Sequence, residues 1–341
     1  MKTKGNKTYI IAEIGPNHNG NVNLAMDMIE RLAGVGVNAV KFQLTKPENA
    51  YSEDAFKTEY QKKHDKTRSP LEMSKSYALK FSDHNLLYNK CIESGVDYLC
   101  SAFEMESLRF IDEQFDLPYF KIPSGEIFSV DLLDYMSLRE KPFILSTGMA
   151  TYKEIETAIS LINKNFKKDI TILHCISNYP VPAVDVNLNV IPELGRRFNY
   201  PVGFSDHTEG NDAAIAAVAL GAVMIEKHVT TDKNLPGPDH KASITIDEFG
   251  ELVTSIRNVD KMLGSSEKIF SEAELKIKNS VRKSIVSKSD LPAGHKLTMD
   301  DICFKRPGTG LLPIYFESII GKKLNSPVKK NHIIKPEQIS E

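Results

Sequence analysis

The chain has 341 residues and a formal net charge of -2 at pH 7, and 41% of its residues are hydrophobic and 26% charged. This is the composition of an ordinary globular protein, and without an overall basic excess it argues against a nucleic-acid partner. The N-terminal run MKTKGNKTYIIAEIG has no secretory signal, and no apolar run reaches the ~20 residues of a membrane span, so we expect a cytoplasmic protein with no membrane partner.

The length fits one domain of about 250 residues followed by a smaller one. We expect the first domain at 1–263, a linker at 264–280 and the second domain at 281–341. The four cysteines lack the Cys-x-x-Cys spacing of zinc ribbons and form no disulfide pattern, so we expect buried free thiols.

Eight short apolar runs of strand length recur along the first domain, with helical segments between them. The runs are Tyr9 to Gly15, Ala39 to Leu44, Asp97 to Phe103, Tyr119 to Gly125, Phe143 to Gly148, Ile170 to Cys175, Val202 to His207 and Val223 to Val229. Eight strand and helix repeats in about 250 residues predict an α/β fold of the TIM (β/α)8 barrel type, in which active sites gather at the C-terminal ends of the strands.

The intervening helices are predicted from apolar periodicity and from capping residues. Stripes at helical spacing are formed by Ala25, Met28, Ile29 and Leu32, by Ile155, Ala158, Ile159 and Ile162, and by Phe249, Leu252, Val253 and Ile256. Two Thr-x-x-Glu pairs, which begin at Thr151 and Thr245, have capping-box spacing and predict helix starts near residues 152 and 246.

Two segments depart from this repeat. The connection between the second and third strands is long and strongly charged from Pro47 to Pro70, which suits either a lid over the barrel mouth or a solvated loop. A polar linker with a short helix follows the barrel, and from Val281 the chain is rich in turns and short strands. At about 60 residues this second unit is too small to hold much core alone, so we expect it to dock on a barrel.

Ionisable and hydroxyl side chains cluster at the C-terminal ends of the expected strands. They are Glu13, Lys41, Gln43, Ser101, Lys121, Ser124, Glu126, Ser146, His174, Ser177, Ser205, His207, Lys227 and His228. Any one of them could be a structural hydrogen-bonding residue, but their coincidence at all eight ends predicts an active site there.

His207 and His228 close the last two strands of the expected barrel. Neighbouring parallel strands lie about 5 Å apart, so both imidazoles can reach one metal ion. Taken alone, the pair fits equally well as two satisfied polar residues at strand ends.

Nine motifs along the chain, in order and spacing, resemble the sialic acid synthase family. They are IAEIGPNHNG (11–20), VKFQ (40–43), FKIPSGE (120–126), ILSTGMA (144–150), LHCISNYP (173–180), VGFSDHT (202–208), IEKHVT (225–230), LPGPDHKAS (235–243) and KRPGTG (305–310). These enzymes condense phosphoenolpyruvate with an N-acetylated amino sugar to make nonulosonic acids. The resemblance covers nearly the whole chain, and the tail is similar to the family's antifreeze-like (SAF) domain.

The resemblance implies a TIM barrel with a C-terminal SAF domain, in a domain-swapped homodimer whose SAF unit covers the partner's active site. It also implies a divalent metal, usually Mn²⁺, on His207 and His228. Imidazole ligands alone would also suit Zn²⁺, Co²⁺ or Fe²⁺, and Mg²⁺ is a further alternative.

The resemblance also places the two substrates. The positions matching the phosphoenolpyruvate site are Lys41, Gln43, Ser101, Lys121, Ser146, Ser177 and Ser205, with Ser177 standing where some members carry Asn. Sugar contacts are expected from Tyr179, from Asp239 and, across the dimer, from Arg306. Cations with hydroxyl and amide donors suit a ligand that carries both a carboxylate and a phosphate.

We expect the nucleophilic C3 of phosphoenolpyruvate to attack the sugar's aldehyde carbon, whose oxygen the metal polarises. Positive charge then develops at C2, water adds there, and phosphate leaves by cleavage of its C–O bond. Glu13 and Glu126 are the candidates for stabilising the cation and handling the water's proton, in an order that the sequence leaves open.

Two other functions remain open from the residues. A Schiff-base aldolase on the same barrel would use Lys121 or Lys227 as its nucleophile. A non-catalytic carbohydrate-binding protein is the other alternative, and the strand-end carboxylates and histidines argue against it. Within the synthase family, LPGPDHKAS and KRPGTG resemble members that use N-acetylmannosamine or its 6-deoxy diacetamido relative more than they resemble the pseudaminic branch, and the two acceptors stay open.

Overall fold

The computed structural model describes residues 7–340 and divides into two compact units, residues 1–264 and 265–341. The described residues do not include 1–6, which belong to the N-terminal run expected to lack a signal. They also do not include 341, the last residue of the expected second domain. None of the helices described between residues 7 and 340 is both long enough and apolar enough to cross a membrane.

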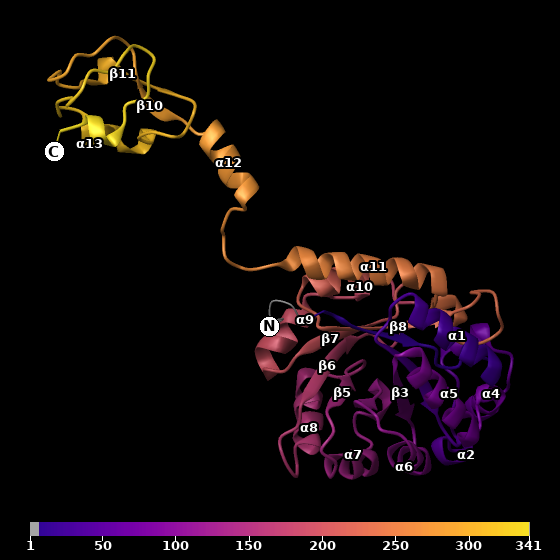
Figure 1. The fold of residues 1–341 in the computed structure, drawn as a ribbon. Coiled ribbons are helices and arrows are strands. Elements are labelled where there is room, and N and C mark those ends of the chain that lie inside the picture. The colour runs from indigo at the N-terminus through magenta and orange to yellow at the C-terminus, as the bar shows by residue number, and fades with distance from the viewer. Residues whose placement is uncertain (1–6, 341) are drawn as a thin grey trace. The chain divides into compact units, whose positions relative to one another are not determined.

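Parallel strands form a closed barrel in the first unit (Figure 1). They are β1 (Tyr9–Glu13), β2 (Ala39–Leu44), β3 (Asp97–Ala102), β4 (Phe120–Ile122), β5 (Phe143–Ser146), β6 (Ile170–Cys175), β7 (Val202–Asp206) and β8 (Met224–Thr230). Each strand pairs with the next in sequence, and β8 returns to pair with β1. A two-residue strand, β9 (Ile244–Thr245), adds to β8. The expected (β/α)8 barrel is confirmed.

Helices cover the outside of the strands (Figure 1). The helices of this unit are α1 (Val22–Gly34), α2 (Pro47–Ala50), α3 (Glu59–His64), α4 (Pro70–Tyr77), α5 (Phe81–Ser94), α6 (Met105–Gln114), α7 (Val130–Ser137), α8 (Tyr152–Ile162), α9 (Val190–Phe198), α10 (Asp212–Ala219) and α11 (Ile246–Leu263). The long charged connection after β2 therefore folds into three short helices, α2 to α4.

Side-chain caps fix two of these helix starts. Thr151 and Thr245 each accept a hydrogen bond from the backbone N–H of the glutamate three residues later, and that glutamate accepts one from the threonine's own N–H. Each cap satisfies amides that have no partner inside the helix. The starts predicted near residues 152 and 246 are confirmed.

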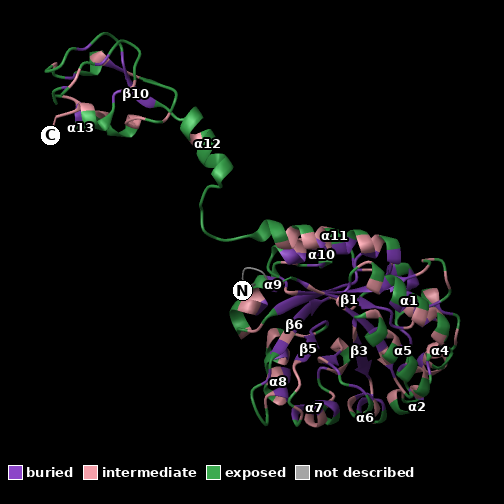
Figure 2. Ribbon diagram, viewed as in Figure 1, coloured by how far each residue is buried: buried purple, intermediate pink, exposed green. Residues whose placement is uncertain are grey.

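The barrel strands are buried (Figure 2), and their apolar side chains belong to two separate layers. The larger layer lies between the strands and the helices and includes the predicted stripes of α1 and α11. The smaller layer contains one residue from each of six strands: Ile11, Ala39, Leu99, Ile144, Leu173 and Met224. Because side chains alternate between the two faces of a strand, these residues point inward and fill the barrel interior.

The inward face changes from apolar to polar toward the C-terminal ends of the strands. Two residues beyond Ile11, Ala39 and Met224, the same face carries Glu13, Lys41 and Glu226, all buried. Strand pairing brings Glu13 opposite Lys41 on one side and opposite His228 on the other. The barrel thus places charged side chains directly above an apolar floor.

The second unit has a small core of its own. Its elements are α12 (Glu272–Val281), the antiparallel pair β10 (Ser284–Ser287) and β11 (Ile302–Lys305), and α13 (Phe316–Ile319). Eight buried apolar side chains, among them Ile285, Leu297 and Ile334, form one cluster within it. The short helix expected in the linker and the turn-rich, β-containing tail are both present.

The barrel has no room for a side chain at Gly203 on β7. A Cβ atom there would lie 2.5 Å from the Met224 carbonyl oxygen and 2.5 Å from Leu173 Cδ2. We predict that Gly203→Ala lowers the free energy of unfolding by about 1–3 kcal/mol, because backbone of the next strand would have to move. Urea denaturation measures the change.

Gly34 at the end of α1 is the matched control, since a Cβ there meets nothing within 4 Å. Gly34→Ala should leave the free energy of unfolding unchanged or raise it by up to about 1 kcal/mol. Equal destabilisation by both substitutions would contradict the close approach of β6, β7 and β8 at Gly203.

Candidate active site

A cavity of about 380 Å³ opens at the C-terminal ends of the barrel strands. Its size is in the usual range for small-molecule sites. Thirteen of the side chains singled out from the sequence line it: Glu13, Lys41, Gln43, Ser101, Lys121, Ser124, Ser146, Ser177, Tyr179, Ser205, His207, His228 and Asp239. The strand ends therefore meet at one site.

Glu126 does not line this cavity, and Arg306 belongs to the second unit. Glu126 is half-buried in a 3-10 turn after β4, accepts a hydrogen bond from Ser129 Oγ, and lines a separate, much smaller cavity. Arg306 is exposed in the second unit, directly after β11. The structure thus does not bring the Glu126 carboxylate to the large cavity.

Four buried charges form the floor of the cavity, and we call them the charged cluster: Glu13, Lys41, Lys121 and Glu226. Lys41 Nζ lies 2.8 Å from Glu13 Oε2 and 3.8 Å from Glu226 Oε2. Lys121 Nζ lies 3.6 Å from Glu226 Oε1. Two ammonium groups and two carboxylates balance, as buried charges must when water is excluded.

The cluster pushes the pKa values of its two carboxyl groups in opposite directions. Burial raises the pKa of Glu13 above its ordinary value, and the negative charge of Glu226 adds to this, although Lys41 acts the other way. Burial also acts to raise the pKa of Glu226, but the charges of Lys121 and Lys41 outweigh it and hold that pKa low. Of the two, Glu13 is therefore the carboxyl group better suited to take up a proton.

Hydroxyl and amide donors surround the charged cluster. Lys121 Nζ donates to Ser146 Oγ at 2.8 Å, and Gln43 Nε2 donates to Glu13 Oε1 at 2.8 Å. Ser205 Oγ donates to Glu226 Oε1 at 3.1 Å. Ammonium groups flanked by hydroxyl donors are the chemistry that binds phosphate and carboxylate groups.

His207 and His228 lie side by side above this floor, with ring centroids 5.6 Å apart. Burial lowers the pKa of His207 to about 4 and puts the pKa of His228 well below its ordinary value. His207 Nδ1 lies 2.7 Å from the Ile176 carbonyl oxygen, which can only accept, so the proton of the neutral ring is on Nδ1. Its Nε2 lone pair is thereby left as an acceptor or metal ligand.

The histidine pair fits a divalent cation in part. His228 Nδ1 is buried without a hydrogen-bond partner, and the nearest carboxylate oxygen, Asp239 Oδ2, is 3.8 Å away. Neutral imidazoles are good ligands for first-row divalent metals. Within residues 7–340, however, no group of three or more His, Cys, Asp or Glu side chains is arranged to hold a metal.

Tyr179 and Asp239 form the upper part of the cavity. The Tyr179 ring lies 4.1 Å from the His207 ring and 5.7 Å from that of His228, measured between centroids. Burial, with a contribution from the charge of Glu13, raises the pKa of Asp239 to about 7. The site is thus anion-binding at its floor and aromatic, with one carboxyl group, above it.

Glu226 is a buried charged residue of the site that the sequence analysis does not single out. It precedes Lys227, which was read as a strand-end candidate, but the two point to opposite faces of β8. Lys227 Nζ is fully buried outside the cavity, 2.7 Å from Asp206 Oδ2, so the barrel does not offer it as a Schiff-base nucleophile. Because side chains alternate between the two faces of a strand, Glu226 points inward like His228, which lies two residues later.

His174 likewise lies outside the cavity. Its Nε2 is 2.8 Å from the Val186 carbonyl oxygen, and its ring stacks on Phe204 in the layer beneath the helices. This strand-end histidine is structural.

Known proteins match both units of the chain. The model of the NeuB family matches residues 28–268, and that of the SAF domain matches residues 282–340. The chain is 41% identical over 332 residues to N,N'-diacetyllegionaminic acid synthase of Campylobacter jejuni, spanning 96% of this chain and 99% of that protein. It is 32% identical over 336 residues to human N-acetylneuraminate-9-phosphate synthase, spanning 97% and 92%.

A solved structure agrees with these matches. The crystal structure of N-acetylneuraminic acid synthetase from Leptospira borgpetersenii superimposes with a TM-score of 0.72 at 32% identity. The match spans 81% of this chain and 93% of that chain.

The charged cluster makes a prediction for stability. Lys41→Met leaves two buried carboxylates facing one ammonium group, so we expect the free energy of unfolding to fall by about 3–5 kcal/mol. Lys46→Met is the control, because the Lys46–Glu106 pair is half exposed and should contribute at most about 1 kcal/mol. Similar losses in urea denaturation would contradict the buried cluster.

Proposed function

The chain belongs to the NeuB family, and we propose that it condenses phosphoenolpyruvate with an N-acetylated amino sugar and water to give a nonulosonic acid and phosphate. The resemblance read from its motifs is confirmed by the family matches. The observation that carries the proposal is the pair of buried lysines, Lys41 and Lys121, beneath the two neutral histidines in one cavity.

The cavity floor suits phosphoenolpyruvate. Lys41 and Lys121 supply two cations, and hydroxyl and amide donors stand around them: Gln43, Ser101, Ser146, Ser177 and Ser205. Lys41 Nζ already contacts Ser101 Oγ at 3.4 Å. We assign these side chains to the phosphate and carboxylate of phosphoenolpyruvate.

The upper half of the cavity suits the sugar. Tyr179 supplies a ring face and Asp239 a carboxyl group for hydroxyl or amide donors of the acceptor. Arg306 would complete the site from a partner subunit, in a domain-swapped homodimer. Its guanidinium fork suits an acetamido carbonyl or a pair of hydroxyls.

His207 and His228 are the residues that would hold a divalent metal, which we propose is Mn²⁺. A cation on these imidazoles would act as a Lewis acid toward the sugar's aldehyde oxygen. The remaining steps are assigned to side chains of the charged cluster.

In the reaction, C3 of phosphoenolpyruvate forms a bond to the aldehyde carbon, and positive charge develops at C2. The Glu226 carboxylate, held ionised by Lys121 and Lys41, stabilises that charge. Water adds to C2 and gives one proton to Glu13, whose raised pKa makes it the better base, and this proton passes on to the former aldehyde oxygen, which becomes a hydroxyl group. The C2–O bond to phosphate then breaks, and the proton of the new C2 hydroxyl leaves with the phosphate, which gives the keto group of the product and hydrogen phosphate.

We propose a diacetamido sugar of the legionaminic branch as the acceptor, ahead of N-acetylmannosamine. The relative named for legionaminic acid is 41% identical to this chain, against 32% for the human relative named for N-acetylneuraminate 9-phosphate.

We predict that Glu13→Gln and Glu226→Gln each lower kcat by at least about a hundredfold, because each removes a group that acts on the reacting atoms. Glu126→Gln, outside the cavity, should cost less than about tenfold. Phosphate release with Mn²⁺, phosphoenolpyruvate and a panel of acetamido sugars gives all three rates.

Near-normal turnover in both cavity variants would refute these assignments. Absence of phosphate release from wild type with every sugar would refute the function itself. Trapping a covalent adduct on Lys121 with borohydride would support a Schiff-base aldolase instead.

Metal removal gives a separate prediction. Chelation should abolish phosphate release, and added Mn²⁺ should restore it, because the aldehyde oxygen loses its Lewis acid. His207→Ala should weaken Mn²⁺ binding at least tenfold in calorimetry while circular dichroism stays unchanged. Full activity after chelation would exclude the metal role.

A further inference from the structure

The connection between β2 and α5 forms one side of the cavity. Side chains from residues 51–78, which we call the wall, line it: Tyr51, Thr58, Tyr60, Gln61, Met73 and Tyr77. These are phenol, hydroxyl, amide and thioether groups, and none carries a formal charge. The wall is thus a neutral surface above an ionic floor.

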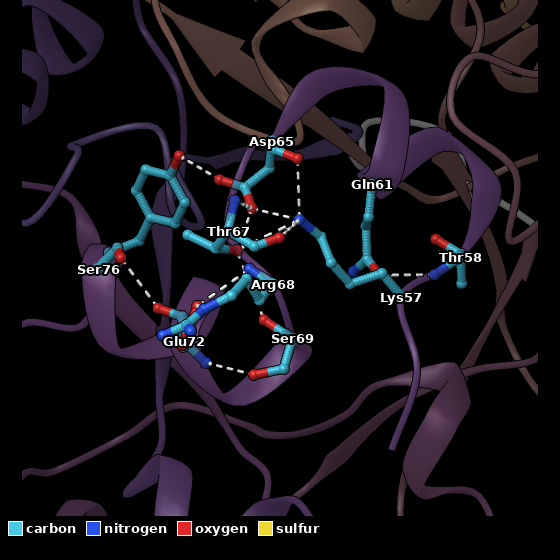
Figure 3. A network of polar contacts seen from close by, with 10 residues as sticks. Lys57, Thr58, Gln61, Asp65, Thr67, Arg68, Ser69, Glu72 and Ser76 are labelled. Carbon is cyan, nitrogen blue, oxygen red and sulfur yellow. Dashed lines mark hydrogen bonds and ion pairs between the residues drawn. The ribbon is translucent and has the colours of Figure 1, made fainter. Parts of the chain in front are cut away.

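A buried ion pair holds the wall together (Figure 3). The side chains of Lys57 and Asp65 are each 4% exposed, and Lys57 Nζ donates to the Asp65 carboxylate. Lys57 Nζ also donates to the Asp65 and Thr67 carbonyl oxygens, at 2.9 and 3.0 Å. The Asp65 carboxylate accepts from Tyr77 OH at 2.9 Å, which ties the end of α4 to the loop before it.

These bonds turn the segment's one buried ammonium group away from the cavity. Four oxygen atoms from Asp65 and Thr67 surround Lys57 Nζ, and Lys57 is not among the lining residues. The ammonium group of Lys62 lies on the exposed side of α3, where it pairs with Glu59. A cation-free face toward the cavity is therefore built into the fold of the wall.

Tyr60 is the part of the wall that reaches the sugar half of the site. Its ring centroid lies 5.1 Å from that of Tyr179, whose own centroid lies 4.1 Å from that of His207. Burial and the nearby charge of Asp239 both raise the pKa of Tyr60, so its hydroxyl stays protonated. A ring with a hydroxyl donor suits the apolar edge and the acetamido oxygen of a sugar.

We propose that the wall, through Tyr60, selects an acceptor sugar whose far end is uncharged and excludes one that carries a phosphate. This inference rests on the proposed function and adds to it the residues that choose the acceptor.

Charge distribution supports the exclusion. Among the described residues that line the cavity, the lysines are Lys41 and Lys121, and both already face carboxylates at the floor. A phosphate at the far end of the sugar would meet Tyr60, Tyr179 and the Asp239 carboxyl group instead. The guanidinium of Arg306, which we propose comes from a partner subunit, is assigned to the acetamido carbonyl or hydroxyls, so such an anion would lose its water without gaining a cation of its own.

The test compares N-acetylmannosamine, its 6-phosphate and the 6-deoxy diacetamido sugar in the phosphate-release assay. Of N-acetylmannosamine and the diacetamido sugar, the one with the higher kcat/KM in wild type should exceed the kcat/KM of the 6-phosphate by at least about a hundredfold. Tyr60→Ala should raise the KM of the uncharged sugar about tenfold and leave the KM of phosphoenolpyruvate within about twofold. Tyr60→Phe should recover most of that loss if ring contact dominates.

Two further variants separate the wall from general damage. Asp65→Asn breaks the ion pair and should raise the sugar KM in the same direction as Tyr60→Ala. Lys62→Ala removes an exposed charge on the same helix, 54% exposed in its side chain, and should change neither KM.

Equal use of the 6-phosphate by wild type would overturn the inference, and so would a Tyr60→Ala variant that shifts both KM values together or neither. Either result leaves phosphate release intact, so the proposed function would stand. Absence of phosphate release with all three sugars would overturn the function and this inference with it.

Discussion

Charge balance inside a closed barrel is the constraint on which the site depends. The barrel interior is filled by an apolar layer, and toward the C-terminal ends of the strands it buries two carboxylates and two ammonium groups. Removing water from these four groups is costly, and their mutual contacts, with hydrogen bonds to the hydroxyl and amide groups around them, offset that cost. Burial and the charge of Glu226 raise the pKa of Glu13, whereas Lys121 and Lys41 hold the pKa of Glu226 low against its own burial, which gives two chemically identical side chains different tasks.

Much of the fold follows from sequence pattern, because apolar period and caps report burial and helix ends directly. The stripe of α1 and the helix starts at α8 and α11 are examples. Most of the site follows too, since parallel strands end at one rim. The sequence prediction missed Glu226 because which face of the barrel a strand residue points to depends on the register of the strand. It included Glu126 because β4 is only three residues long and the turn after it changes the direction of the chain.

The wall shows a different limit of sequence reasoning. A segment as charged as residues 47–70 is usually a solvated surface, and its composition does not reveal which charge is buried. Lys57 and Asp65 lie eight positions apart, and their pairing depends on how α3, α4 and the loop between them fold around Lys57 Nζ. Their pairing leaves the wall with a neutral surface toward the cavity. The wall therefore selects the acceptor, whereas the charged cluster at the floor carries out the reaction.

The central claim is that this cavity brings phosphoenolpyruvate and a sugar aldehyde together and adds water at C2. It is tested most directly by labelling the bridging oxygen of phosphoenolpyruvate with a heavy oxygen isotope and analysing the products by mass spectrometry. The account predicts that all of the label leaves in the released phosphate, because the C–O bond breaks. Label retained in the sugar acid would show cleavage of the P–O bond and would contradict the account.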